Sequence, residues 1–125
     1  MSRETEPHAF VHEAELRLAD DVDPRAVGAA VTVALCGHWE HDGPCRWPHQ
    51  NEVGDGLFRT LFVCDAGEEP EVRARISSAL GGTPQWRVVA ERARQVADAE
   101  RPLAEHLLAL PRRPVSATPA PAPRT

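Results

Sequence analysis

The sequence predicts an α+β domain built on a four-stranded antiparallel sheet. Two patterns carry this prediction. Segments in which apolar side chains alternate with polar ones mark strands, and segments with apolar side chains at helical spacing mark helices. The 125 residues, of which 42% are hydrophobic and 26% charged, suit one globular domain with its own core. We expect a flexible arm over residues 1–8, a single domain over 9–110 and a disordered tail over 111–125.

The first strand and the first helix follow directly from the N-terminal arm. Residues 10–18, FVHEAELRL, alternate between an apolar and a largely charged face, which is typical of a half-buried strand. His12 falls on the apolar face, so we expect a buried histidine with a polar partner rather than a metal ligand. Asp23 and Pro24 are favourable at a helix start and predict a helix over 24–36. Its apolar stripe contains Val27, Ala30, Val31, Ala34 and Leu35.

The central part of the chain predicts two further strands. Residues 38–41 form a short extended segment, and residues 42–56 are rich in Gly, Pro, Asn and Asp, which indicates a loop. Residues 57–64 give the clearest strand, with apolar side chains on both faces, so this strand should be central in the sheet. Phe58 and Phe62 lie on one face; Leu57, Leu61 and Val63 lie on the other.

The C-terminal half predicts a second helix over 68–80, a fourth strand over 85–90 and a helical segment over 91–110, interrupted near Pro102. The order of elements resembles the ferredoxin-like βαββαβ fold over residues 9–92, with two helices on one face of the sheet. This resemblance is one of architecture and implies no function. Five prolines among the last fifteen residues predict a disordered tail with polyproline II character.

An apolar surface remains on the sheet face opposite the two helices. Leu57, Leu61 and Val63 lie there, and burial against a second copy would remove them from water, so we expect a homodimer. The alternative is that the C-terminal leucines fold back over the same face. These are Leu103, Leu107 and Leu110, spaced i, i+4 and i+7.

Composition excludes several classes of function. The net charge of −5 argues against a protein that grips nucleic acid phosphates. The N-terminus lacks the apolar segment of a signal peptide, and the longest apolar run, 26–36, is too short to span a bilayer. Three cysteines cannot all pair with one another, which favours a reduced, cytoplasmic protein. The absence of lysine and the abundance of alanine and arginine are typical of GC-rich genomes and predict a bacterial source.

Residues 36–49, CGHWEHDGPCRWPH, concentrate the residue types that bind metals. Thiolates and imidazoles are the preferred ligands of zinc. The subset most able to converge is His41, Cys45 and His49, if Gly43 and Pro44 turn the chain back. Cys36 and His38 are further candidate ligands. The spacing matches no known zinc signature, and in the alternative interpretation the histidines face solvent while Cys36 and Cys64 are small buried side chains.

The same stretch suggests a recognition surface. Trp39, Arg46 and Trp47 are residue types that dominate binding surfaces, and a loop held by a rigid sheet is the usual place for them. We therefore predict a small non-catalytic binding module whose 38–49 loop binds a metal ion, a small molecule or a protein partner. The alternatives are a small enzyme with a histidine-based acid/base pocket between sheet and loop, using His41 or His49, and a structural accessory subunit.

Overall fold

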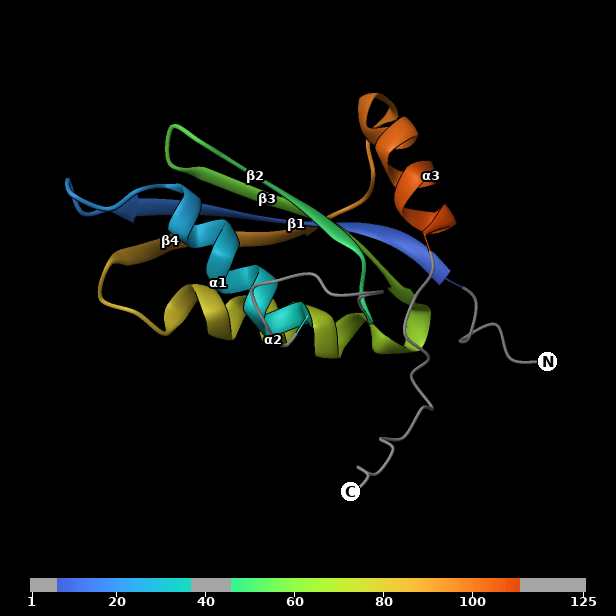
Figure 1. Ribbon diagram of the computed structural model, residues 1–125, viewed down its shortest axis with the longest axis horizontal. Helices are drawn as coiled ribbons and strands as arrows, with labels where there is room; N and C mark the ends of the chain where they lie inside the picture. The colour runs from blue at the N-terminus through green and yellow to red at the C-terminus, as the bar shows by residue number, and fades with distance from the viewer. Residues whose placement is uncertain (1–6, 37–45, 111–125) are drawn as a thin grey trace, which may run out of the picture.

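One four-stranded sheet organises the chain in the computed structural model, which describes residues 7–36 and 46–110 (Figure 1). The strands are β1 (Pro7–Leu18), β2 (His49–Gly54), β3 (Leu57–Asp65) and β4 (Trp86–Arg94). The helices are α1 (Arg25–Cys36), α2 (Glu69–Gly81) and α3 (Arg101–Ala109), with short 3₁₀ turns η2 (Ala66–Glu68) and η3 (Asp98–Glu100) before α2 and α3. The sheet order is β2-β3-β1-β4 and every pairing is antiparallel, which confirms the α+β class.

The second strand is where the sequence prediction was wrong. The structure has β2 at His49–Gly54, inside the segment expected to be a loop, whereas the expected strand at 38–41 lies outside the described residues. The sequence of β2, HQNEVG, is mostly polar because this is an edge strand, half-buried on one side only. Pairing with the apolar strand β3, rather than the propensity of its own residues, makes it extended.

The β2–β3 connection is a tight hairpin. Asp55 and Gly56 are its two central residues, and both have positive φ, 49° and 79°. Asp-Gly is the dipeptide that this kind of two-residue turn favours. A Cβ on Gly56 would lie 3.0 Å from the backbone oxygen of Leu16, whose amide donates to the Gly56 carbonyl at 2.7 Å. Both the backbone angle and the close approach therefore require glycine.

Helices α1 and α2 cover one face of the sheet and enclose the main core (Figure 1). Its largest fully buried side chains include Trp47, Phe58, Phe62, Ile76 and Leu80. His12 lies on this face, as predicted, and is 5% exposed. Its Nε2 lies 2.8 Å from Glu91 Oε1, and Arg73 approaches its Nδ1 at 3.1 Å. The prediction of a core histidine with polar partners is confirmed.

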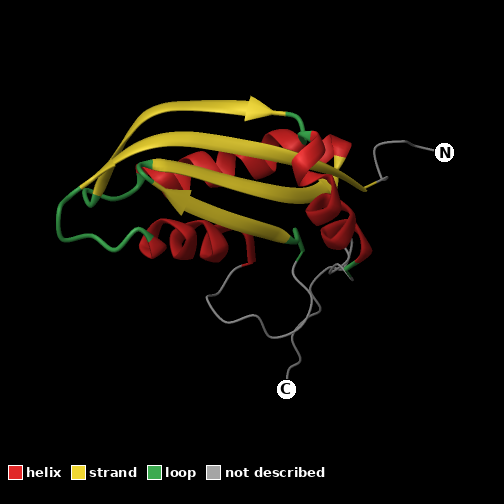
Figure 2. Cartoon of the chain, turned by 90° about the horizontal axis from the view of Figure 1, so that it is seen from above, coloured by secondary structure: helices red, strands yellow, loops and turns green. Residues whose placement is uncertain are grey.

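Helix α3 lies on the opposite face, over one end of the sheet (Figures 1 and 2). Ala104 and Leu107 of α3 pack against Val11, Leu61 and Val63, with Leu103 partly buried beside them. Two of the three predicted leucines therefore fold back on this face, whereas Leu110 is 38% exposed. Residues 91–94, expected to be helical, instead extend β4, and Pro102 stands in the first turn of α3, where its missing N–H costs nothing. At the other end of the face Leu57 remains 44% exposed.

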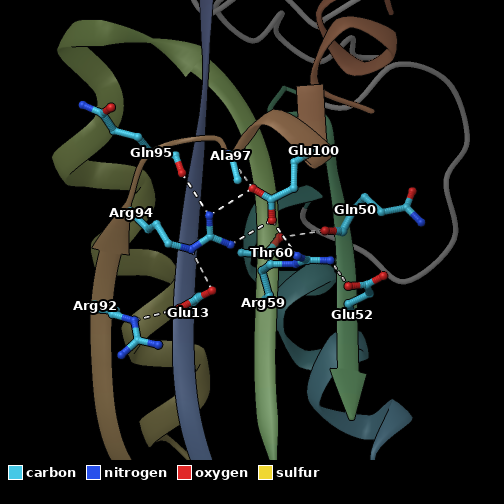
Figure 3. A network of polar contacts seen from close by, with 10 residues as sticks. All are labelled: Glu13, Gln50, Glu52, Arg59, Thr60, Arg92, Arg94, Gln95, Ala97 and Glu100. Atoms are coloured by element: carbon cyan, nitrogen blue, oxygen red, sulfur yellow. Dashed lines mark hydrogen bonds and ion pairs between the residues drawn. The ribbon is translucent and has the colours of Figure 1, made fainter. Parts of the chain in front are cut away.

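A buried carboxylate holds α3 to the sheet. Glu100, 8% exposed, accepts hydrogen bonds from Arg94 at 2.8 and 3.0 Å, from Arg59 at 2.5 Å and from the Ala97 amide at 2.9 Å (Figure 3). The hydrogen bonds from Arg94 lower the pKa of Glu100 to about 2, against the opposing effect of burial. None of the described helices is long and apolar enough to cross a membrane.

Candidate functional site

A polar hollow of about 440 Å³ lies between α1 and β2. Gly28 and Thr32 line it from α1, one turn apart, and His49 and Asn51 line it from β2. Both β2 residues point towards the helix layer because they alternate along the strand with Gln50 and Glu52. The volume is in the range of small-molecule sites.

His49 is oriented by hydrogen bonds on both ring nitrogens. Nδ1 lies 3.0 Å from the backbone oxygen of Trp47, and Nε2 lies 3.1 Å from Thr32 Oγ1. A carbonyl oxygen only accepts, so in the neutral imidazole the proton resides on Nδ1. Nε2 is then an acceptor, and the Thr32 hydroxyl donates to it. The Thr32 hydroxyl group therefore donates a hydrogen bond to the unprotonated, basic ring nitrogen of His49.

Asn51 completes this cluster. Its Nδ2 donates to the carbonyl oxygen of Gly28 at 3.0 Å and to Thr32 Oγ1 at 3.2 Å. Its Oδ1 is hidden from solvent and meets no donor among the described residues. The absence of a side chain at position 28 allows this contact, because a Cβ there would lie 3.4 Å from Asn51 Nδ2. Within the described part of the chain, the site thus contains a buried acceptor whose hydrogen bond is not made.

The two predicted recognition residues that are described, Arg46 and Trp47, form a clasp with Glu68. Trp47 is 1% exposed, and its Nε1 donates to Glu68 Oε1 at 3.2 Å. The Arg46 guanidinium lies 4.3 Å from the Trp47 ring centroid and donates to Glu68 Oε2 at 3.3 Å. Trp47 therefore belongs to the core and orients the start of β2. The side chain of Arg46 is the partly exposed member of this group of three residues. Trp39 lies outside the described residues.

The five predicted metal ligands are divided by the structure. His38, His41 and Cys45 lie outside the described residues. The two ring nitrogens of His49 lie within hydrogen-bond distance of Thr32 Oγ1 and of the Trp47 backbone oxygen. No group of three or more histidine, cysteine, aspartate and glutamate side chains within 7–36 and 46–110 is arranged to hold a metal ion.

The cysteines differ from the expectation of a fully reduced chain. Cys36, at the end of α1, is disulfide-bonded. In this form Cys36 has no thiolate to offer a metal ion. Cys64 is fully buried in the main core, as its place on a central strand predicted.

Sequence reasoning missed Thr32 and Asn51. Thr32 is the single polar side chain within the apolar run of α1. A lone polar residue on a buried helix face needs a hydrogen-bond partner, so this position could have been recognised from the sequence as part of a polar cluster. Asn51 was assigned to a loop, and only the pairing of β2 with β3 turns it towards α1.

Comparisons with known proteins give no independent indication of function. No protein-family model matches the chain, and neither a curated protein nor a solved structure matches it. The function must therefore be argued from the residues themselves.

Proposed function

We propose that this chain is a small binding module and that the hollow between α1 and β2 takes a small polar molecule. Thr32, His49 and Asn51 give the hollow hydrogen-bonding groups in fixed orientations. The ligand class that suits them carries an N–H or O–H donor at one end, as primary amides, amines and alcohols do. His49 is the last residue of the 38–49 segment that was singled out from the sequence.

The unmade hydrogen bond of Asn51 Oδ1 carries this proposal. A buried acceptor without a donor costs about 1–3 kcal/mol, so proteins rarely retain one without a use. The amide cannot simply be turned over, because its oxygen would then face the Gly28 carbonyl, 3.0 Å from the present nitrogen. A ligand donor that reaches Oδ1 after a small shift would recover this energy.

The fold supports the proposal by holding the site rigid. We infer ferredoxin-like topology, on the basis of the strand-helix-strand-strand-helix-strand order and the β2-β3-β1-β4 sheet. Such a sheet fixes β2 against β3 while α1 packs over it, so the two walls of the hollow are set by separate elements. The topology itself carries no function.

The test is a titration followed by protein NMR with acetamide, ethylamine and ethanol as probes. Saturable shifts of the Asn51 side-chain amide and of the Thr32 backbone amide are expected with at least one probe and should disappear in Asn51→Ala. Glu52→Gln is the matched control, on the same strand but directed to the other face. Gly28→Ala should weaken binding by crowding Asn51. No shift with any probe would mean that the acceptor meets only water, and would overturn the proposal.

One observation favours a catalytic role as a second candidate. The 3.1 Å contact between Thr32 Oγ1 and His49 Nε2, with Nδ1 held by a carbonyl oxygen, is the arrangement in which imidazole activates a hydroxyl group. A general acid/base function of His49 would give turnover that falls as the imidazole is protonated. Hydrolysis of 4-nitrophenyl acetate that is lost in His49→Gln but kept in Thr32→Ser would support it, and equal rates in both variants would refute it.

Zinc binding by His41, Cys45 and His49 stays a prediction of the sequence. At His49 the ion would have to replace Thr32 as the partner of Nε2. Element analysis of untagged protein, compared with Cys45→Ser, tests this directly, and the bound ion should be released by acid because the imidazole and thiolate ligands become protonated.

A further inference from the structure

The outer edge of β2 is open for pairing with a further strand. β2 and β4 are the two outer strands, and within residues 7–36 and 46–110 no strand pairs with the outer side of β2 (Figure 3). The Val63 amide donates to the Pro48 carbonyl oxygen at 2.9 Å, and the same register continues to Gly54. The even-numbered residues of β2 therefore bond to β3, whereas the backbone groups of Asn51 and Val53 point away from the sheet.

The two outer strands are protected to different degrees. Strand β4, WRVVAERAR, carries four charged side chains among its nine residues, and its pairing with β1 shifts register once. Charged side chains and bulges are the usual means by which sheet edges avoid pairing with other chains. In β2, HQNEVG, the single acidic or basic residue is Glu52, whose side chain is paired with Arg59. The β2 edge therefore has little to prevent the addition of a strand.

The hollow between α1 and β2 runs along this open edge. In an antiparallel pair, the residue opposite Asn51 would place its Cβ about 4.5–5.5 Å from the Asn51 Cβ, on the same face of the sheet. Asn51 lines the hollow, so the opposite side chain would enter the hollow beside the unmade hydrogen bond of Asn51 Oδ1. A ligand with both a backbone and a polar side chain would therefore use the edge and the hollow together.

We propose that β2 and α1 bind an extended peptide of a partner protein, which adds to the sheet as a fifth strand antiparallel to β2 and inserts an asparagine side chain into the hollow. The inference rests on the proposed function, because the inserted side chain is the small polar molecule of that proposal. The primary amide of asparagine supplies the N–H donor that Asn51 Oδ1 lacks. In this mode of recognition the main chain gives affinity and the inserted side chain gives selectivity.

A second copy and the chain's own C-terminal segment are poorer occupants of this edge. Of the four strands, β2 is the one that α1 approaches most closely. Antiparallel pairing of two β2 edges about a two-fold axis would keep both α1 helices on one face at about the strand spacing of 4.8 Å, whereas packed helix axes need about 8–10 Å. Five of residues 111–125 are proline, which lacks the N–H that a strand donates. A separate extended peptide meets neither obstacle.

Hydrogen exchange of the β2 amides tests the open edge. In the free protein the amides of Asn51 and Val53 should exchange rapidly, while those of Gln50 and Glu52 are protected by their bonds to β3. The probe is the heptapeptide acetyl-TVTNTVT-amide, whose central asparagine would lie opposite Asn51. Bound peptide should slow exchange at Asn51 and Val53 by at least about tenfold.

Two N-methylated forms of the peptide separate strand addition from binding of the side chain alone. A methyl group on the asparagine backbone nitrogen removes the N–H that would donate to the Asn51 carbonyl oxygen. A methyl group on the next threonine nitrogen lies on the side away from β2 and is the matched control. An NMR titration should show the first form binding at least about tenfold more weakly than the second, because a main-chain hydrogen bond is lost.

The role of the hollow is tested separately by the side chains. Aspartate in place of the peptide's asparagine keeps the shape but offers no donor at neutral pH, so affinity should fall about tenfold. The variant Asn51→Ala should bind the asparagine and aspartate peptides equally. If both substitutions left affinity unchanged while the N-methyl pattern held, the proposed function would be wrong and strand addition would stand.

Four results would overturn strand addition. The peptide could show no saturable binding, the two N-methylated forms could bind equally, or the Asn51 and Val53 amides could already be protected in the free protein. Protection that grows with protein concentration would assign the edge to a second copy. If acetamide bound in the hollow and the peptide bound no more tightly than acetamide, strand addition would be wrong and the proposed function would stand.

Discussion

The two faces of the sheet are stabilised in different ways. On the face covered by α1 and α2 the side chains of β3 are the buried aromatics Phe58 and Phe62, and the polar residue His12 is fully enclosed by its partners. On the other face, apolar side chains are buried only where α3 covers them, and the remainder is a row of paired charges. Helix α3 therefore divides this face into a small core and an exposed surface, and strand β3 contributes side chains to both.

The largest effect is expected from Phe62→Ala. Phe62 is fully buried between the sheet and the helices, and loss of a buried phenylalanine leaves a cavity and costs about 3–5 kcal/mol. Urea unfolding should show the whole domain unfolding earlier in one transition. A loss below about 1 kcal/mol would mean that the helix-covered face is not the main core.

Leu107→Ala on α3 should cost less, about 2 kcal/mol, at the low end for a leucine, because its site lies at the margin of the domain. We expect faster hydrogen exchange in α3 while the amides of β1 and β3 keep their protection, since only the small core around Val11 and Leu61 is opened. Equal loss of protection in both regions would show that the two faces unfold as one unit.

Acid should release α3 before the rest of the domain unfolds. The pKa of Glu100 falls from 4.5 to about 2 on folding, because Arg94 stabilises the carboxylate. A lowered carboxyl pKa gives stability that is complete above pH 4.5 and is lost as the pH falls towards 2. Burial acts to raise the pKa of Glu13, but the hydrogen bonds from Arg94 and Arg92 outweigh it and lower the pKa, so Glu13 adds to the same acid loss.

Glu100→Gln is the matched test of this pH dependence. It keeps the shape of the side chain and should cost about 1.5 kcal/mol near neutral pH, since the arginines that lose their partner retain access to water. Thermal melts from pH 7 to pH 2 should show a shallower acid loss in the variant. An identical profile in the two proteins would place the acid-sensitive group elsewhere.

Leu57→Ala should have the smallest effect on the stability of the single chain, within about 0.5 kcal/mol, because the side chain is already largely in water. Urea unfolding measures this change. An unfolding curve close to that of the original chain would sharpen the contrast between the part of the open face that α3 covers and the part around Leu57, and a large loss of stability would contradict it.

Much of the fold was open to prediction from local patterns. The alternation FVHEAELRL placed β1 and the buried histidine correctly, and helix-favouring residues at 23–24 and 68–71 placed α1 and α2. The second strand was missed because an edge strand such as HQNEVG buries one side only and carries almost no apolar signal. The Asp55-Gly56 hairpin signal was present in the sequence and would have corrected the boundary.

The site was only partly predictable. His49 was singled out from residue type, but its partner Thr32 lies 17 residues away in the chain and meets it only when β2 packs against α1. Asn51 joins the cluster through its own hydrogen bond to Thr32. Trp47 illustrates the opposite error: its residue type suggested a recognition surface, whereas its position under the helices makes it part of the core.

Local residue patterns were enough to predict β1, β3, α1 and α2 and the apolar side of each, because those properties follow from the period of the residues along one element. What covers each face of the sheet depends on contacts between elements. Whether Leu61 is enclosed and Leu57 exposed depends on where α3 packs on the sheet, and that position depends on the contact between Glu100 and Arg59, which are 41 residues apart in the chain. Contacts between residues far apart in the chain leave no periodic signal, so only the folded sheet reveals them.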